Sequence, residues 1–126
     1  NLCCGYFLGD GSMITFIHSR IYLERPCTGG WQRFIARFPD TSKPVSLQEL
    51  VDAGIPYDDI VWALQCSRKE HFPELLEALF RTHRDLYAAI KSCSSPNTIG
   101  YMVWVCLPRN LHTQYITNLL QLENKS

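Results

Sequence analysis

The stretch Pro73–Cys93, PELLEALFRTHRDLYAAIKSC, carries the longest helical pattern in the chain. Its large apolar residues recur at steps of three and four, which places them on one stripe of a helix. They are Leu75, Leu76, Leu79, Phe80, Leu86, Tyr87 and Ile90. On the opposite face Glu77 precedes Arg81 by four residues, a spacing that favours an ion pair. The pattern predicts one helix over 73–92, about 30 Å long, that serves as the scaffold of the domain.

Further helix signals lie on both sides of this stretch. Ser46 and Glu49 have the spacing of a capping box, in which a hydroxyl and a carboxylate satisfy amides at a helix start. Gly54 suits the left-handed residue that ends such a helix. Pro56 fits the first turn of the next helix. A last amphipathic helix is predicted over 111–122.

Three stretches carry strand signals. Met13–Leu23, MITFIHSRIYL, is rich in β-branched and aromatic residues and predicts a strand. Residues 31–38 fit either a strand or a short helix. Ile99–Leu107, IGYMVWVCL, is short and nearly all apolar, which is typical of a strand covered on both faces. We therefore expect a single α+β domain over 1–126. Its small mixed sheet combines the N-terminal strands with strand 99–107 and packs against about four helices.

Composition narrows the class of protein. With 46% hydrophobic and 19% charged residues, the 126-residue chain resembles an ordinary soluble globular domain. No apolar run approaches the roughly 18 residues of a membrane span. Twelve basic and twelve acidic residues give no net charge, which argues against nucleic acid as a partner. Residues 46–65 have the length of a helix-turn-helix motif, but Asp58 and Asp59 at the second helix would repel phosphates.

The chain has six cysteines, which is many for its length: Cys3, Cys4, Cys27, Cys66, Cys93 and Cys106. Their spacing contains no C-x-x-C pair, so we expect no zinc site of the usual kind, and no cofactor. Several stand among apolar residues, where a free thiol behaves as a small hydrophobe. An even number also permits three disulfides in an oxidising compartment. We favour free thiols and an intracellular protein, with a disulfide-linked secreted protein as the alternative.

The histidines do not form a recognisable catalytic pattern. His18 and His112 invite comparison with two-histidine phosphoesterases, which need a hydroxyl residue two positions after each histidine. Here Ser19 and Thr113 follow immediately and would point to the opposite face of a strand. His83 falls on the apolar stripe of the 73–92 helix, so we interpret it as a core or boundary residue.

Residues 5–12, GYFLGDGS, resemble the signature of LAGLIDADG homing endonucleases, in which an apolar helix ends in an acidic residue and a glycine. The following MITFI is similar to the first DNA-facing strand of that family. The resemblance implies a metal-dependent DNA endonuclease that acts as a homodimer, with Asp10 as the metal ligand and catalytic residue. An ordinary Gly-Asp-Gly turn is the competing interpretation of the same residues.

Because these catalytic patterns are short, we expect a non-enzymatic protein-interaction or regulatory domain. Neutral charge and an aromatic content of 12% favour binding to a protein partner or self-association, for example as a homodimer. The apolar face of the 111–122 helix is wider than one core needs, and such surplus apolar surface marks an interface. The predicted partner-binding residues are Leu111, Tyr115, Ile116 and Leu119. The endonuclease that uses Asp10 is the alternative function.

Overall fold

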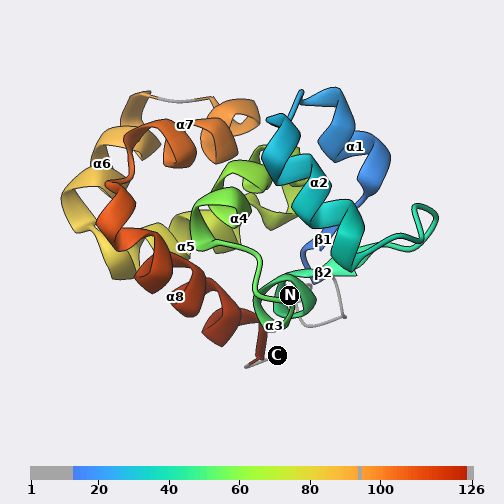
Figure 1. Ribbon diagram of the computed structural model, residues 1–126. Helices are drawn as coiled ribbons and strands as arrows, with labels where there is room; N and C mark the ends of the chain where they lie inside the picture. The colour runs from blue at the N-terminus through green and yellow to red at the C-terminus, as the bar shows by residue number, and fades with distance from the viewer. Residues whose placement is uncertain (1–12, 94, 125–126) are drawn as a thin grey trace.

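The computed structural model describes residues 13–93 and 95–124, which are mostly helical with one small sheet (Figure 1). The elements are β1 (Thr15–Phe16), α1 (His18–Leu23), α2 (Thr28–Arg37), β2 (Val45–Ser46), α3 (Leu47–Asp52), α4 (Tyr57–Ala63), α5 (Phe72–Thr82), α6 (Arg84–Cys93), α7 (Ile99–Cys106) and α8 (His112–Asn124). Short 3₁₀ helices are η2 (Leu64–Cys66), η3 (Lys69–His71), η4 (Pro96–Thr98) and η5 (Arg109–Leu111). The predicted α+β class is confirmed in this coarse form, with more helices than expected.

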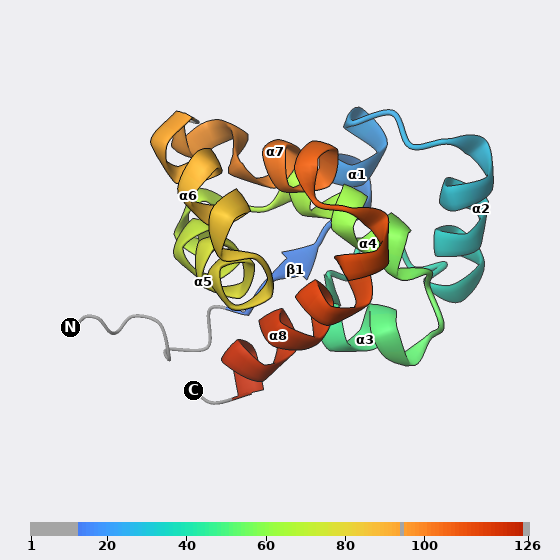
Figure 2. The same cartoon turned by 90° about the vertical axis from the view of Figure 1, so that its left-hand side faces the viewer.

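Helix α4 lies in the middle of the molecule, with α2 at one edge and α6 at the opposite edge (Figures 1 and 2). Helix α8 packs against α4 and α5, and α7 packs against α4, α5, α6 and η2. Among the described helices, none is both long and apolar enough to cross a bilayer.

The sheet consists of β1 and β2 in antiparallel pairing, with Thr15 opposite Ser46 and Phe16 opposite Val45. Ile14 and Phe16 are buried while Thr15 is exposed, which is the alternation of a half-buried strand. The two short strands therefore anchor the beginning of the described chain to the loop before α3.

The predicted strand Met13–Leu23 is confirmed only at Thr15–Phe16, because the chain then turns into α1. There His18 and Ile21 are buried three residues apart, as on one face of a helix. His18 Nε2 donates to the carbonyl of Phe38 at 2.7 Å, which fixes the ring of this buried histidine. Tertiary contacts of this kind override the strand preference of β-branched residues.

Several predicted helix boundaries are confirmed. The Ser46 hydroxyl accepts from the Glu49 amide at 3.1 Å and the Glu49 carboxylate accepts from the Ser46 amide at 2.9 Å, so the capping box is complete. Gly54, just after α3, has a φ of 78°. Pro73 lies in the first turn of α5. Residues 31–38, for which strand and helix were both open, form most of α2.

The predicted continuous helix 73–92 is wrong, because the chain breaks at His83 into α5 and α6. His83 is extended, with φ −157° and ψ 95°. Its Nδ1 accepts the Leu86 amide at 3.1 Å, so the ring caps the first turn of α6. Helix α6 then packs against α5, where the rings of Phe80 and Tyr87 lie 5.2 Å apart. A side chain that competes for backbone amides ends the helix without changing the apolar periodicity.

The predicted strand 99–107 is also wrong, because this segment forms helix α7. Ile99, Val103 and Leu107 are buried at four-residue steps, whereas Tyr101 and Val105 are about half exposed. Burial at every fourth residue is the pattern of a helix with one face in the core. Periodicity does not separate a short apolar run that forms a buried strand from one that forms a helix.

Gly100 allows α7 to pack closely against the backbone of η2. A Cβ on Gly100 would lie 2.4 Å from the carbonyl oxygen of Leu64 in η2. Only a residue without a side chain lets the helix approach that backbone so closely.

The side chains of α8 form the centre of the core. Tyr115 is fully buried, and its hydroxyl donates to the carbonyl of Leu75 at 2.9 Å. Burial raises the pKa of this phenol. Asn118 donates to the Thr82 hydroxyl at 2.9 Å, near the end of α5. Helix α8 is therefore held along its length by polar contacts as well as by apolar packing.

Replacing Gly100 with alanine should destabilise the fold by about 1–3 kcal/mol or more, because the new methyl group would meet backbone atoms. Urea unfolding measures the change. Gly29→Ala is the matched control, since a Cβ there would lie 3.4 Å from Nη1 of Arg33, an ordinary contact. Equal stability of the two variants would contradict the close approach of α7 and η2.

Tyr115→Ala should cost about 3–5 kcal/mol of unfolding free energy, as expected for removal of a buried ring. Tyr115→Phe should cost about 0.5–1.5 kcal/mol, the net contribution of one hydrogen bond. Chemical denaturation distinguishes the two. A stable, fully folded Tyr115→Ala variant would show that this side chain does not belong to the core.

Candidate functional site

The four predicted partner-binding residues do not form a surface. Tyr115, Ile116 and Leu119 are fully buried at 0% exposure, and Leu111 is half-buried against the core. Helix α8 is covered by α4 and α5, so its apolar width is used inside the domain. The assignment of these side chains to partner contact is therefore corrected, whereas the predicted helix is present.

Asp10, the predicted metal ligand and catalytic residue of the alternative endonuclease function, lies outside the described residues. The resemblance therefore stays a prediction. Within residues 13–93 and 95–124, no three side chains of histidine, cysteine, aspartate or glutamate gather in a way that could hold a metal ion.

The most exposed large apolar side chains of the described residues lie on α1. Leu23 is 77% exposed and Tyr22 is 63% exposed, more than Tyr101, Val105 or the other large hydrophobic residues that stand out on the described surface. These two neighbours end α1 and leave its apolar tip open. The ring of Tyr22 lies 5.2 Å from that of Trp31 in α2, which is only partly covered.

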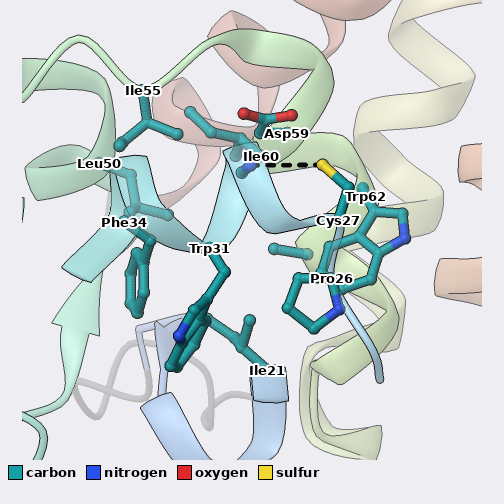
Figure 3. A pocket seen from close by; sticks show the side chains of 12 residues that line it. Ile21, Pro26, Cys27, Trp31, Phe34, Leu50, Ile55, Asp59, Ile60 and Trp62 are labelled. Carbon is teal, nitrogen blue, oxygen red and sulfur yellow. Dashed lines mark hydrogen bonds between the residues drawn. The ribbon is translucent and has the colours of Figure 1, made fainter. Parts of the chain in front are cut away.

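A small pocket of about 60 Å³ lies between α2 and α4 (Figure 3). Trp31 and Phe34 extend from α2 toward Ile21 of α1, and Ile60 comes from α4. The complete lining is Ile21, Pro26, Cys27, Gly30, Trp31, Phe34, Leu50, Ile55, Asp59, Ile60, Trp62 and Ala63. Aliphatic and aromatic walls with few polar groups are typical of a ligand site.

The polar side of the pocket is formed by the thiol of Cys27 and the carboxylate of Asp59, and Asp59 pairs with Arg33. Arg33 Nη2 donates to Asp59 Oδ2 at 2.8 Å, an ion pair that joins α2 to α4. The hydrogen bond to Asp59 and its charge raise the pKa of the Arg33 guanidinium. Cys27 Sγ accepts the Gly30 amide at 3.3 Å and caps α2. Both ionic side chains are partly exposed, so the pair is worth little and can open.

An outer groove adjoins the pocket. It is lined by Tyr22, Leu23, Arg25, Pro26, Thr28, Trp31 and Gln32. Because Pro26 and Trp31 line both the groove and the pocket, the two spaces are neighbours. We call Tyr22, Leu23, Arg25, Pro26 and Trp31, together with the pocket, the α1–α2 surface.

Charge is divided unevenly along the chain. Residues 13–44 contain five basic and two acidic residues, whereas residues 45–124 contain six basic and nine acidic ones. The segment with α1 and α2 therefore carries a formal charge of +3, and the remainder of the described chain −3. Of the side chains that line the α1–α2 surface, Arg25 at the groove is basic and Asp59 at the pocket is acidic.

The described thiols differ in exposure. Cys27, Cys66, Cys93 and Cys106 are free, and all but Cys66 are exposed. Burial, followed by the charge of Glu24, raises the pKa of Cys66 to about 11, so this thiol stays protonated at neutral pH.

His112 has a structural role. Its Nδ1 lies 2.8 Å from Asp58 Oδ1 and its Nε2 lies 3.3 Å from the carbonyl oxygen of Leu107. The ring is 3% exposed, and both nitrogens are engaged. This arrangement ties the start of α8 to α4, with no open position for a substrate.

A second buried polar group involves Glu123 of α8. Its Oε2 accepts the Ile14 amide at 2.7 Å. Desolvation raises the pKa of this carboxyl and outweighs the hydrogen bond from the Ile14 amide, which lowers it. The charge of Glu74 also raises this pKa, and His71 lowers it. The group lies beside β1, away from both the pocket and the outer groove, and we interpret it as part of the fold.

Searches with this chain find no matching family model, curated protein or solved structure. The α1–α2 surface is therefore interpreted from its own chemistry.

Sequence reasoning missed Tyr22, Leu23 and Trp31 because it placed the first two in a strand. A usable signal was present: Glu24-Arg25-Pro26 stops a helix directly after two large apolar residues. The basic excess of residues 13–44 is a second signal that the net charge of zero conceals.

The raised pKa of Glu123 predicts a pH-dependent contribution to stability. Above that pKa the carboxylate is charged and disfavoured in the folded state. As the pH falls from neutrality toward the ordinary value of 4.5, the folded state binds the proton first, so the wild type gains stability relative to Glu123→Gln. Urea unfolding of both proteins at pH 7 and at lower pH measures this gain. A stability difference that is constant or moves the other way would contradict the assignment.

Proposed function

We propose that this chain is a protein-interaction domain that binds a protein partner through the α1–α2 surface. The observation that carries the proposal is the exposure of Tyr22 and Leu23, neighbouring large apolar side chains beside a pocket with apolar walls. The expected function is thus retained, but its contact surface moves from α8 to the opposite side of α4.

Energetics support an interface at this place. Complete burial of a large apolar side chain contributes about 1.5–3 kcal/mol. Aromatic side chains near the centre of an interface often dominate binding, and here Tyr22 and Trp31 stand side by side with their rings in contact. Arg25 and Gln32 at the groove supply the polar margin that interfaces usually have.

The double substitution Tyr22→Ser with Leu23→Ser should reduce partner retention by about tenfold or more, because two exposed anchors are lost. Pull-downs from extracts of the source cells, quantified by mass spectrometry, measure retention. The fold should survive, since surface substitutions usually change stability by only about 0.5 kcal/mol. Thermal unfolding verifies this.

The matched control is Tyr101→Ser with Val105→Ser on α7, which removes a similar pair of exposed apolar side chains. Partners should be retained by this variant as well as by the wild type. Size-exclusion chromatography of all three proteins tests self-association through the same surface. Partner retention that is insensitive to Tyr22 and Leu23, or equally sensitive to the α7 pair, would refute the proposal.

A further inference from the structure

We infer that the segment bound by the α1–α2 surface is an acidic peptide segment with one large apolar side chain, which enters the pocket between α2 and α4. The inference rests on the proposed function and narrows it to one chemistry of partner. It combines two observations, the shape and lining of the pocket and the charge around it.

The lining of the pocket selects an apolar group. Phe34, Ile60 and Leu50 are nearly fully buried although they face the pocket, so a ligand there would be surrounded by carbon on most sides. Trp31 and Trp62 add aromatic faces, against which a ring packs well in a tilted or edge-on geometry. A phenylalanine or similar side chain fits this lining and would act as the anchor.

The charge around the groove selects acidic residues beside the anchor. Arg25 lines the groove and makes no ion pair within the described part of the chain. The groove also includes Thr28, the first residue of the ten-residue helix α2, whose positive dipole end favours anions. Arg33, which lines neither space, pairs with Asp59 at the pocket through a partly exposed ion pair.

The backbone conformation of Arg25 also supports an acidic partner. Its φ of 57° is left-handed, a conformation that disfavours residues with a Cβ and that glycine or asparagine adopts more easily. The side chain is exposed and has no hydrogen bond with described residues, so packing does not explain an arginine here. An ion pair with a carboxylate of the partner would explain an arginine at this position.

Nucleic acid and anionic membranes would also be attracted to arginine side chains at this surface. Neither places a single apolar side chain in a bounded pocket, and Asp59 at its edge would repel phosphate. The pocket therefore favours a peptide, and the other two ligands become outcomes of the test.

The probes are three short fluorescent peptides, followed by anisotropy. One consists of Asp, Glu, Gly and Ser with a central Phe; the second has Ala in place of Phe; the third has Lys in place of the acids. The first should bind, and each of the others should bind about tenfold more weakly or worse. Equal binding of the Phe and Ala peptides, or of the acidic and basic peptides, would overturn the inference.

Alkylation locates the bound peptide. Cys27 lines the pocket, whereas Cys93 and Cys106 lie on α6 and α7 and are also exposed. Saturating acidic Phe peptide should slow iodoacetamide labelling of Cys27 severalfold, measured by mass spectrometry, and leave the two reference thiols unchanged. Undiminished labelling of Cys27 with peptide bound would place the anchor elsewhere and overturn the inference.

Arg25→Asn tests the acidic specificity while retaining a residue that tolerates the left-handed backbone. It should lower affinity for the acidic Phe peptide severalfold without lowering the midpoint of thermal unfolding. Arg84→Gln on α6, at the opposite edge, changes the net charge equally and should leave affinity unchanged. An equal loss in both variants would indicate a net-charge effect only and overturn the inference.

The same assays include anionic lipid vesicles and a single-stranded oligonucleotide. Arg25-dependent binding of either, without binding of the acidic Phe peptide, would overturn the inference. If no peptide binds but pull-downs still depend on Tyr22 and Leu23, only the inference fails. If pull-downs do not depend on those residues, the proposed function fails with it.

Discussion

The burial of α8 against α4 and α5 is the interaction on which the rest of the structure depends. Tyr115 lies at its centre, where its hydroxyl would be costly to bury without the carbonyl of Leu75 to accept its hydrogen bond. His112 ties the beginning of the same helix to Asp58 of α4, and Glu123 ties its end to Ile14. Because α8 is anchored at its start, middle and end, α4 and α5 are fixed relative to each other, and α7 and the sheet are arranged around them.

The α2 edge of the molecule is held by fewer buried contacts. Phe34 and the hydrogen bond from His18 secure α2 from one side, and the partly exposed ion pair of Arg33 and Asp59 joins it to α4. The pocket lies at this edge, beside the exposed side chains of Tyr22 and Leu23. A domain with a well-packed half can keep such an open apolar surface at little risk to its stability. That contrast is the physical basis for placing the proposed interaction at α1 and α2.

Local signals predicted the helix ends well. The capping box at Ser46, the glycine after α3 and the proline in the first turn of α5 act through neighbouring residues, which sequence displays directly. The same reasoning failed at His83 and at 99–107. In the first case a side chain capped a new helix within an unbroken apolar pattern, and in the second a nine-residue apolar run fitted two periodicities equally. The candidate site was missed for the same reason, because Tyr22 and Leu23 had been assigned to a strand.

Taken by itself, the sequence determined that this is an α+β chain with no net charge. It also indicated where α3, α4, α5 and α8 begin, and it showed amphipathic helices with wide apolar faces. Tertiary structure alone decided which of that surface is covered. Residues 115, 116 and 119 are buried since α4 and α5 close over them, whereas residues 22 and 23 are exposed since no element of the described chain covers the tip of α1. Amphipathic spacing identifies an apolar face, but it carries no information about whether another part of the same chain, or a partner, will cover it.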